Sequence, residues 1–405
     1  MFKKIFHTIL LKRNFWRYAS FSEIADLYTT RIMRTIAINV GAAFMSVYML
    51  KNGYSVVQVA LFWAAYFGFK VILTLPIAQY IASKGAKRAI IISNFLYIPS
   101  MIAFIFLPEF GNWALLVTGA FQSISAAMYD IAHNVNFSRV KSVDAAGSQV
   151  AKMNIFEQVA KAVSPLIGGL LAMFFDPRAA IAVSAMFFLF AALPLMRTPD
   201  TRSKGFSLAP KGFPWRMTAR SLLVQMPIGF DVFASGTAWS IFLTTVIFAA
   251  SDNQVYAELG ALTAIVFLVS IAATRVYGKL IDKSSGGSLL FWAAAGNVIV
   301  HVLRILVRNP IMVLGTNTAK EVMTAGYSMA YMRGMFDVAD RSGYRVLYVG
   351  LVILASNVGS AAAALLLAGV IALFNSVNGF MAFYILTAAV SSLIMLARFR
   401  VYSRA

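Results

Sequence analysis

Long runs of apolar residues recur along the chain, separated by short polar segments rich in Gly, Pro, Lys and Arg. The runs begin about every 30 to 35 residues, which leaves room in each repeat for a helix of roughly 20–25 residues and a loop. A helix of that length crosses the hydrocarbon core of a bilayer. The pattern therefore predicts an all-α polytopic membrane protein with twelve transmembrane helices, at approximately 21–50, 55–82, 88–107, 112–138, 149–173, 177–196, 218–249, 256–282, 287–307, 311–335, 344–373 and 377–397.

The composition agrees with this pattern and excludes several classes of protein. The 405 residues are 60% hydrophobic and only 12% charged, whereas soluble domains carry about 25% charged residues. Because Cys is absent and there are only three His residues, we expect no disulfide, no metal site and no bound cofactor. The sequence contains no HExxH or GxSxG motif, so we do not expect an enzyme either.

The basic residues are distributed unevenly between the predicted loops. The termini and the loops after even-numbered helices hold most of the Lys and Arg residues, and the opposite loops hold only Lys51, Arg178 and Arg308. The positive-inside rule then places both termini in the cytoplasm. We expect a multi-pass protein of the bacterial cytoplasmic (inner) membrane. The formal charge of +20 follows from these membrane-flanking loops and does not indicate nucleic-acid binding.

The longest non-apolar stretch, RTPDTRSKGFSLAPKGFPWR from Arg197 to Arg216, divides the predicted helices into two sets of six. We predict an N-terminal six-helix bundle over 1–196, a cytoplasmic linker over 197–217 and a C-terminal six-helix bundle over 218–405. Within the first of these, the segment from Phe2 to Leu11 has an apolar face opposite Lys3 and Lys4. This segment is either a short interfacial helix or a lead-in to the first span.

This organisation resembles that of the major facilitator superfamily, and one loop strengthens the resemblance. After the eighth predicted helix the chain reads GKLIDK, from Gly278 to Lys283, which matches the first part of that superfamily's loop signature. The resemblance implies two pseudo-symmetric six-helix bundles around a central cavity. It also implies a conformational latch formed by Gly278, Asp282 and Lys283, although the equivalent loop of the first half has Ala82 in place of the acid.

The fifth predicted helix contains a second family-like element. Its sequence SPLIGG looks like the Gly-Pro-x-x-Gly-Gly element of many exporters of the superfamily, with Ser in place of the first Gly. Small residues and a Pro also permit close helix packing and a bend. The four residues concerned are thus either part of an export signature or helix-packing residues: Ser164, Pro165, Gly168 and Gly169.

Ionisable side chains within the predicted helices are functional candidates, because a charge at membrane depth costs several kcal/mol unless it is paired or faces water. Four bases on the first, second and fifth helices are candidate substrate-binding residues: Arg31, Arg34, Lys70 and Lys161. A cavity that they line would be positive and would favour an anion. Lys152, Arg275 and Arg304 lie nearer to helix ends, so we expect them to extend to the interface.

The acids at similar depth are candidate proton-coupling residues. Asp231 ranks first, because it lies mid-helix beside Pro227 and Gly229, and Glu321 ranks second. Asp130 and His133 are three positions apart and could form a proton relay.

Glu157 lies four positions before Lys161, a spacing at which the two charges can neutralise each other. A structural network of ion pairs therefore remains an alternative to a binding site.

The sequence as a whole predicts a secondary active transporter for a small organic or amphipathic anion, working by alternating access and coupled to protons, or alternatively to sodium. Export is the direction that the fifth helix favours. No Walker-type loop is present, so ATP is not the direct energy source. The expected partners are a small-molecule substrate, the coupling ion and the lipid bilayer, and the expected state is a monomer. A lysophospholipid or lipid-like flippase, a multidrug efflux transporter and a non-transporting receptor or scaffold remain as alternatives.

Overall fold

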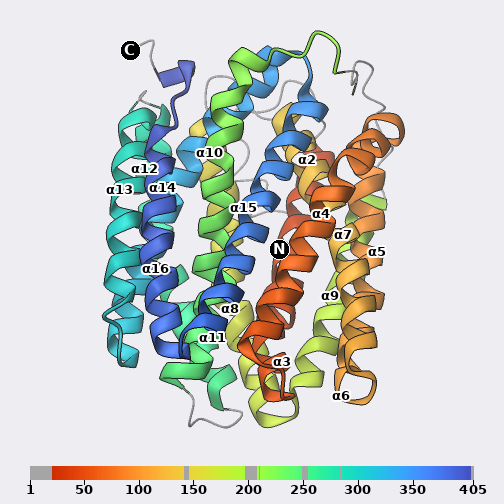
Figure 1. The fold of residues 1–405 in the computed structure, drawn as a ribbon. Helices are drawn as coiled ribbons and strands as arrows, with labels where there is room; N and C mark the ends of the chain where they lie inside the picture. Colours follow the sequence, from red (N-terminus) through yellow and green to blue (C-terminus); the bar gives the residue numbers. More distant parts are fainter. Residues whose placement is uncertain are drawn as a thin grey trace.

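The computed structural model of the protein describes residues 21–140, 146–196, 208, 210–248, 254–282 and 285–402. In this part of the chain the regular structure is helical, and the long helices run side by side (Figure 1). The amphipathic segment 2–11, residues 197–207 and 209 of the predicted linker, and Lys283 lie outside the described residues.

The first six spans occupy the N-terminal half. The first span bends at Gly41 and is composed of a long helix, a 3-10 turn and a short helix, and a four-residue helix follows the third span. The elements are α2 (Phe21–Val40), η1 (Ala42–Phe44), α3 (Met45–Lys51), α4 (Val56–Lys84), α5 (Ala86–Ile105), α6 (Leu107–Phe110), α7 (Asn112–Val140), α8 (Ala146–Phe174) and α9 (Pro177–Met196).

The last six spans occupy the C-terminal half. Their elements are α10 (Trp215–Phe233), η2 (Ala234–Ala238), α11 (Trp239–Phe242), η3 (Leu243–Ile247), α12 (Gln254–Asp282), α13 (Gly286–Arg304), α14 (Pro310–Ser342), α15 (Arg345–Leu373), α16 (Ser376–Ser392), η4 (Leu393–Leu396) and η5 (Arg400–Tyr402). The prediction of twelve spans is confirmed. The tenth span continues to Ser342, beyond the predicted end at 335, where Gly343 with a φ of 72° ends the helix.

Eleven of the described helices are long and apolar enough to cross a membrane by length and composition. The remaining span, the tenth in chain order, is α14. It is 33 residues long but more polar, since it carries charged residues such as Lys320 and Glu321 as well as an Asp- and Arg-rich end. A polar span is tolerated where it faces protein or a water-filled cavity instead of lipid.

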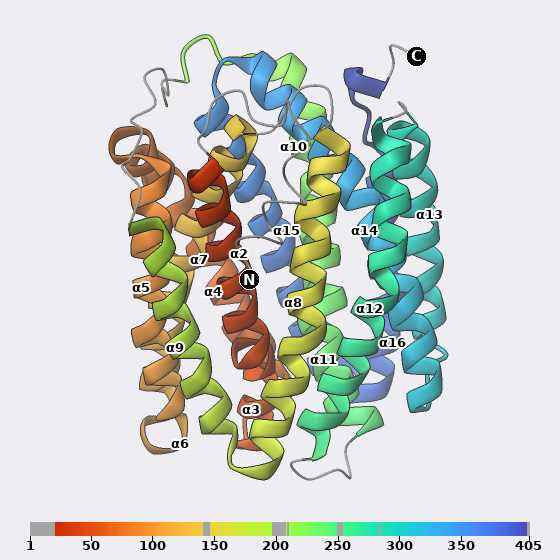
Figure 2. The same ribbon diagram turned by 180° about the vertical axis from the view of Figure 1, so that it is seen from behind.

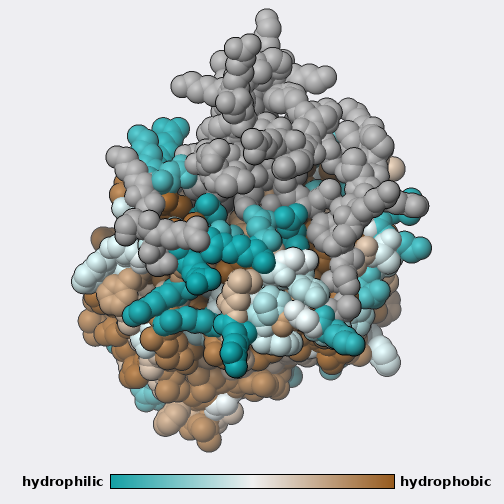
Figure 3. Space-filling view, turned by 90° about the horizontal axis from the view of Figure 1, so that it is seen from above, coloured by the Kyte–Doolittle hydropathy of each residue, from teal (hydrophilic) through white to brown (hydrophobic). Residues whose placement is uncertain are grey.

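The bundle has two ends, which we call the linker end and the opposite end. The linker end holds the start of α10 and the end of α14, and the opposite end holds α3 and α6 (Figures 1 and 2). Seen from the linker end, hydrophilic side chains gather on the top surface, whereas the visible flank is largely hydrophobic (Figure 3). This distribution suits a helical bundle whose flanks contact lipid.

The two halves meet along two pairs of helices. In the first pair α4 packs along α15 (Figure 1), and in the second α8 packs along α12 (Figure 2). Glycines make the second contact close: a Cβ at Gly169 would collide with the carbonyl oxygen of Tyr256, and one at Gly260 would collide with that of Pro165. Backbones can approach this closely only where the side chain is a hydrogen atom.

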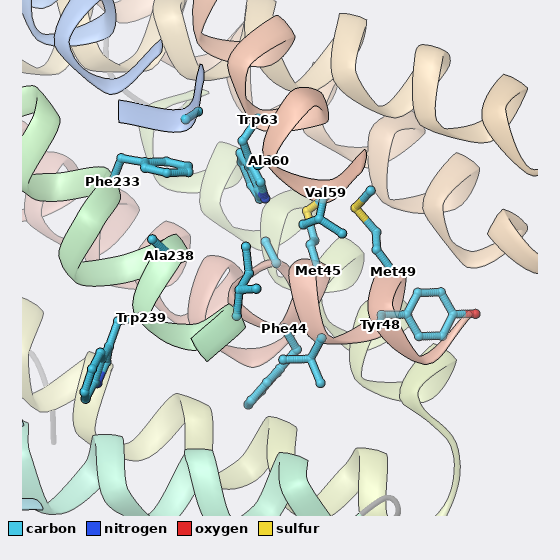
Figure 4. Close-up of a cluster of buried hydrophobic side chains, with 14 of the residues drawn as sticks. Phe44, Met45, Tyr48, Met49, Val59, Ala60, Trp63, Phe233, Ala238 and Trp239 are labelled. Carbon is cyan, nitrogen blue, oxygen red and sulfur yellow. The ribbon is translucent and has the colours of Figure 1, made fainter. Parts of the chain in front are cut away.

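Aromatic and apolar side chains from both halves fill the opposite end of the bundle. The cluster in Figure 4 includes Phe44, Trp63, Phe233 and Trp239. The ring of Phe44 on η1 lies 5.6 Å from the ring of Tyr256 on α12. At the linker end the rings of α7 and α14 also meet, with the centroids of Phe137 and Phe336 5.4 Å apart. Apolar contacts between the halves thus exist near both ends, and polar side chains are concentrated between them.

The seventh span is irregular beyond its middle. Two π-helical turns, η2 and η3, flank the short helix α11. Such turns widen a helix and are frequent at functional sites. They place Ser235, Gly236 and Ser240 on the wall of the space between the halves.

Candidate functional site

A cavity of about 680 Å³ lies between the two halves. This volume is in the range of small-molecule sites. Its charged lining comprises six bases and four acids, from both halves of the chain: Arg31, Arg34, Lys70, Lys161, Arg304 and Lys320, with Asp130, Glu157, Asp231 and Glu321. The four bases proposed from the sequence for substrate binding therefore line one cavity.

Two ion pairs of the cavity lining join helices of the N-terminal half. The guanidinium of Arg31 on α2 donates two hydrogen bonds to the carboxylate of Glu157 on α8, at 2.6 and 3.1 Å. The ammonium of Lys70 on α4 donates to Oδ2 of Asp130 on α7 at 3.0 Å. Each pair neutralises one base and one acid of the lining.

Arg34 is held differently, by neutral partners. Its guanidinium donates to Oδ1 of Asn94 at 2.7 Å and to Oγ of Ser125 at 3.3 Å. It also lies over the ring of Tyr129, 4.0 Å from the centroid, an attractive contact for a cation. Arg34 is only 2% exposed, and in the described part of the chain no carboxylate forms an ion pair with it.

In the C-terminal half, Asp231 is the centre of a buried polar cluster. Oδ1 accepts a hydrogen bond from Nδ2 of Asn297 at 3.0 Å and lies 2.5 Å from Nε2 of His301. Oδ2 accepts hydrogen bonds from Nζ of Lys320 at 2.9 Å and from the hydroxyl of Tyr327. The carboxylate is 0% exposed, and both of its oxygens accept hydrogen bonds. Asp231 thereby links α10 to α13 and α14.

Arg304, at the end of α13, lies inside the protein. It is 2% exposed, lines the cavity and lies over the ring of Trp239 at 4.2 Å. Its Nε and Nη1 atoms are buried and have no hydrogen-bond partner. The expectation that this side chain extends to the interface is therefore wrong, because α13 turns it toward Trp239 on α11 and Tyr384 on α16 instead of lipid headgroups.

Lys161 and Glu321 are the remaining charged residues of the lining. Lys161 lies 5.5 Å from the centroid of the Phe267 ring, and among the described residues neither Lys161 nor Glu321 forms an ion pair. The direct ion-pair partner of Glu157 is Arg31 on α2 and not Lys161. One acid and three bases of the cavity are thus left without an ion pair.

The structure does not support the proposed relay between Asp130 and His133. Asp130 pairs with Lys70, whereas His133 is buried, stacks on Tyr129 and has no hydrogen-bond partner at either ring nitrogen. His133 also lies outside the cavity lining. Within the described residues no group of three His, Asp or Glu side chains is arranged to hold a metal ion.

The remaining candidates are the latch and helix-packing residues, of which Pro165 lines the cavity. Gly278 is buried on α12, and Asp282 is exposed at its end; the latch also requires Lys283, which lies outside the described residues, so it stays a prediction. On α8 a Cβ at Gly168 would collide with the carbonyl of Val40, and Oγ of Ser164 donates to the carbonyl of Ala160 at 2.5 Å. The hydrogen bond of Ser164 stays within α8, whereas the close approaches of Gly168 to α2 and of Gly169 to α12 pack α8 against those helices.

Sequence reasoning missed the partners of Asp231 and the role of Arg304. His301 and Lys320 are 70 and 89 positions from Asp231, so no local spacing connects them. The available signal was that each lies within an apolar span, where an ionisable side chain needs a partner.

Comparison with known proteins gives a consistent result. The sequence model of the Major Facilitator Superfamily matches residues 27–247, more than half of the chain. No curated protein sequence matches.

Among solved structures, three illustrate the fold. The transporter FucP in its outward conformation has a TM-score of 0.63 at 14% identity, covering 93% of this chain and 100% of that one. Another structure of FucP, the E. coli fucose:proton symporter, has a TM-score of 0.64 at 14% identity, covering 92% and 98%. The human organic anion transporter MFSD10 (TETRAN) has a TM-score of 0.65 at 14% identity, covering 93% and 99%. At such identity the likeness establishes the fold alone.

Proposed function

The chain belongs to the major facilitator superfamily, and from that membership we propose that it is a secondary active transporter that carries a small organic anion through the central cavity, coupled to protons. The two halves, 1–196 and 218–405, would rock about the cavity and expose it to each side of the membrane in turn, with 197–217 as the linker. Membership of this transporter family places the chain in the membrane.

The observation that carries the choice of an anion is the imbalance of unpaired charge in the cavity. Three ion pairs, Arg31 with Glu157, Lys70 with Asp130, and Lys320 with Asp231, cancel six of the ten charged side chains. The remaining four are Arg34, Lys161, Arg304 and Glu321. A positive surplus in a cavity walled by apolar helices attracts and orients an anion.

Glu321 is the best-placed candidate for the coupling proton. It lines the cavity, and in the described chain its carboxylate has neither an ion pair nor a hydrogen bond, so a proton can bind without displacing a donor. The first choice from the sequence, Asp231, would have to give up one of its four close contacts. We therefore place Glu321 above Asp231 for proton coupling.

The names of the structural neighbours support the same class of activity. MFSD10 is described as an organic anion transporter, and FucP as a fucose:proton symporter. We further propose that both termini face the cytoplasm in a bacterial inner membrane, from the excess of basic residues on the linker side.

The proposal is tested by uptake into sealed proteoliposomes containing the full chain, with panels of organic anions, organic cations and sugars, each with and without a pH gradient. We expect uptake of anions alone, increased by the gradient. Arg34→Gln and Lys161→Gln should each reduce that uptake, whereas Arg216→Gln, which changes an exposed base at the linker end, should not. Uptake of cations or sugars without anions would refute the proposal.

A further inference from the structure

Arg304 is the unusual member of the cavity charges. Arg304 is only 2% exposed. A guanidinium buried to this extent normally has an acid or several acceptors, because burial of an unpaired cation is strongly unfavourable. Here Nε and Nη1 have no acceptor. Asp231 is fully used by its own donors, and Glu321 makes no ion pair in the described structure. Arg304 is thus a residue of the cavity lining that keeps two donors without an acceptor.

The aromatic neighbours of Arg304 explain how it is held in place without an acid. The rings of Trp239 and Tyr384 lie 4.2 and 5.8 Å from its guanidinium carbon. Cation-π contacts stabilise the charge and fix the plane of the guanidinium, but they leave the edge of that plane unbound. An edge with paired N–H donors is the part that binds a carboxylate or a phosphate.

Arg34, in the N-terminal half, is also held against aromatic rings and has no acid as an ion-pair partner among the described residues. Tyr129 lies 4.0 Å from its guanidinium carbon, with Tyr97 and Phe188 at 5.3 Å. Its Nε has no acceptor, and its other donors reach only neutral side chains. The cavity thus has one aromatic-backed, acid-free guanidinium from each half of the chain.

We propose that the transported anion carries two anionic groups, of which one binds Arg34 and the other binds Arg304. This inference rests on the proposed function and narrows its substrate class to a dianion such as a dicarboxylate. A ligand that joins one arginine of each half would draw the halves together around it. Binding would then depend on both halves at once, as alternating access requires.

The test compares matched ligands that differ by one charge. Purified full-length protein is titrated with phthalate and phthalamate, and with glutarate and glutaramate, where an amide replaces one carboxylate of the same skeleton. We expect the dianion of at least one pair to bind roughly 10- to 100-fold more tightly than its monoamide, the range of a lost charge-assisted contact. Arg304→Gln should abolish this preference, and the control Arg216→Gln should keep it.

The outcomes separate this inference from the proposed function. Equal affinities for diacid and monoamide in the wild-type protein would overturn the proposal of a dianionic substrate, while the proposal of anion transport would stand. The same conclusion would follow if Arg304→Gln weakened both ligands equally. If the uptake experiment shows transport of cations or sugars without anions, the proposed function itself fails. The wild-type comparison needs no variant, so it remains decisive if Arg304→Gln does not fold.

Discussion

The guanidinium of Arg31 holds the carboxylate of Glu157 through two hydrogen bonds, at 2.6 and 3.1 Å, across 126 positions of sequence. This pair ties α2 to α8 in the wall of the cavity. Glu157 is buried, so its charge depends on Arg31 for compensation.

Loss of Arg31 should therefore destabilise the protein. Arg31→Gln leaves a buried carboxylate without its partner, which costs about 1–3 kcal/mol here because the cavity admits some water. We expect a lower melting temperature in detergent. The double variant Arg31→Gln with Glu157→Gln should recover part of the loss, and a single variant as stable as the wild type would show that the pair contributes little.

Asp231 should behave as a structural acceptor. Asp231→Asn removes the counter-charge of the buried ammonium of Lys320, and breaking a fully buried pair costs about 3–5 kcal/mol. The expected result is a marked fall in melting temperature, partly reversed by Lys320→Met in the same chain. An Asp231→Asn protein with unchanged stability and no response to pH would instead restore Asp231 as the proton site.

Glu321 should control the response to protons. In Glu321→Gln the cavity keeps its shape but loses the unpaired carboxylate, so the pH gradient should no longer increase anion uptake, while the protein melts as the wild type does. Glu109→Gln provides the control, because Glu109 is exposed and pairs with Arg178 at the opposite end. Coupling retained in Glu321→Gln would exclude this residue as the proton site.

The contact of α4 with α15 offers a direct test of movement between the halves. A Cβ at Gly350 would lie 3.2 Å from the Cβ of Ala78, slightly closer than the roughly 3.5–4.5 Å found in disulfides. The chain has no Cys of its own, so Ala78→Cys with Gly350→Cys should form a single disulfide on oxidation. This bond should stop uptake, and a reductant should restore it.

Each single-cysteine variant is the control for that experiment, and neither should respond to oxidation. Full uptake by the cross-linked protein would mean that α4 and α15 do not separate at this level during transport.

The glycines between α8 and α12 should be intolerant of larger side chains. Gly169→Ala would force its Cβ against the carbonyl of Tyr256, and overpacking of this kind typically costs about 1–3 kcal/mol. We expect lower stability and slower uptake. Gly369→Ala, where nothing lies within 4 Å of the new Cβ, should change neither, and equal tolerance at both positions would contradict the close packing.

Local apolar periodicity and short motifs were sufficient to predict the twelve spans and the resemblance to a transporter family. It also identified which charges lie at membrane depth. For Arg31, Arg34, Lys70 and Lys161, depth alone was enough to select side chains that share one cavity.

The pairing of the charges depends on the tertiary structure. Spacing along one helix suggested that Glu157 pairs with Lys161 and that Asp130 acts with His133, but helix rotation turns Glu157 to Arg31 and Asp130 to Lys70. The position of Arg304 was misjudged for the same reason, since nearness to a helix end does not say which neighbour covers it. Burial and pairing are set by the angles at which distant helices pack, and no local pattern in the sequence contains those angles.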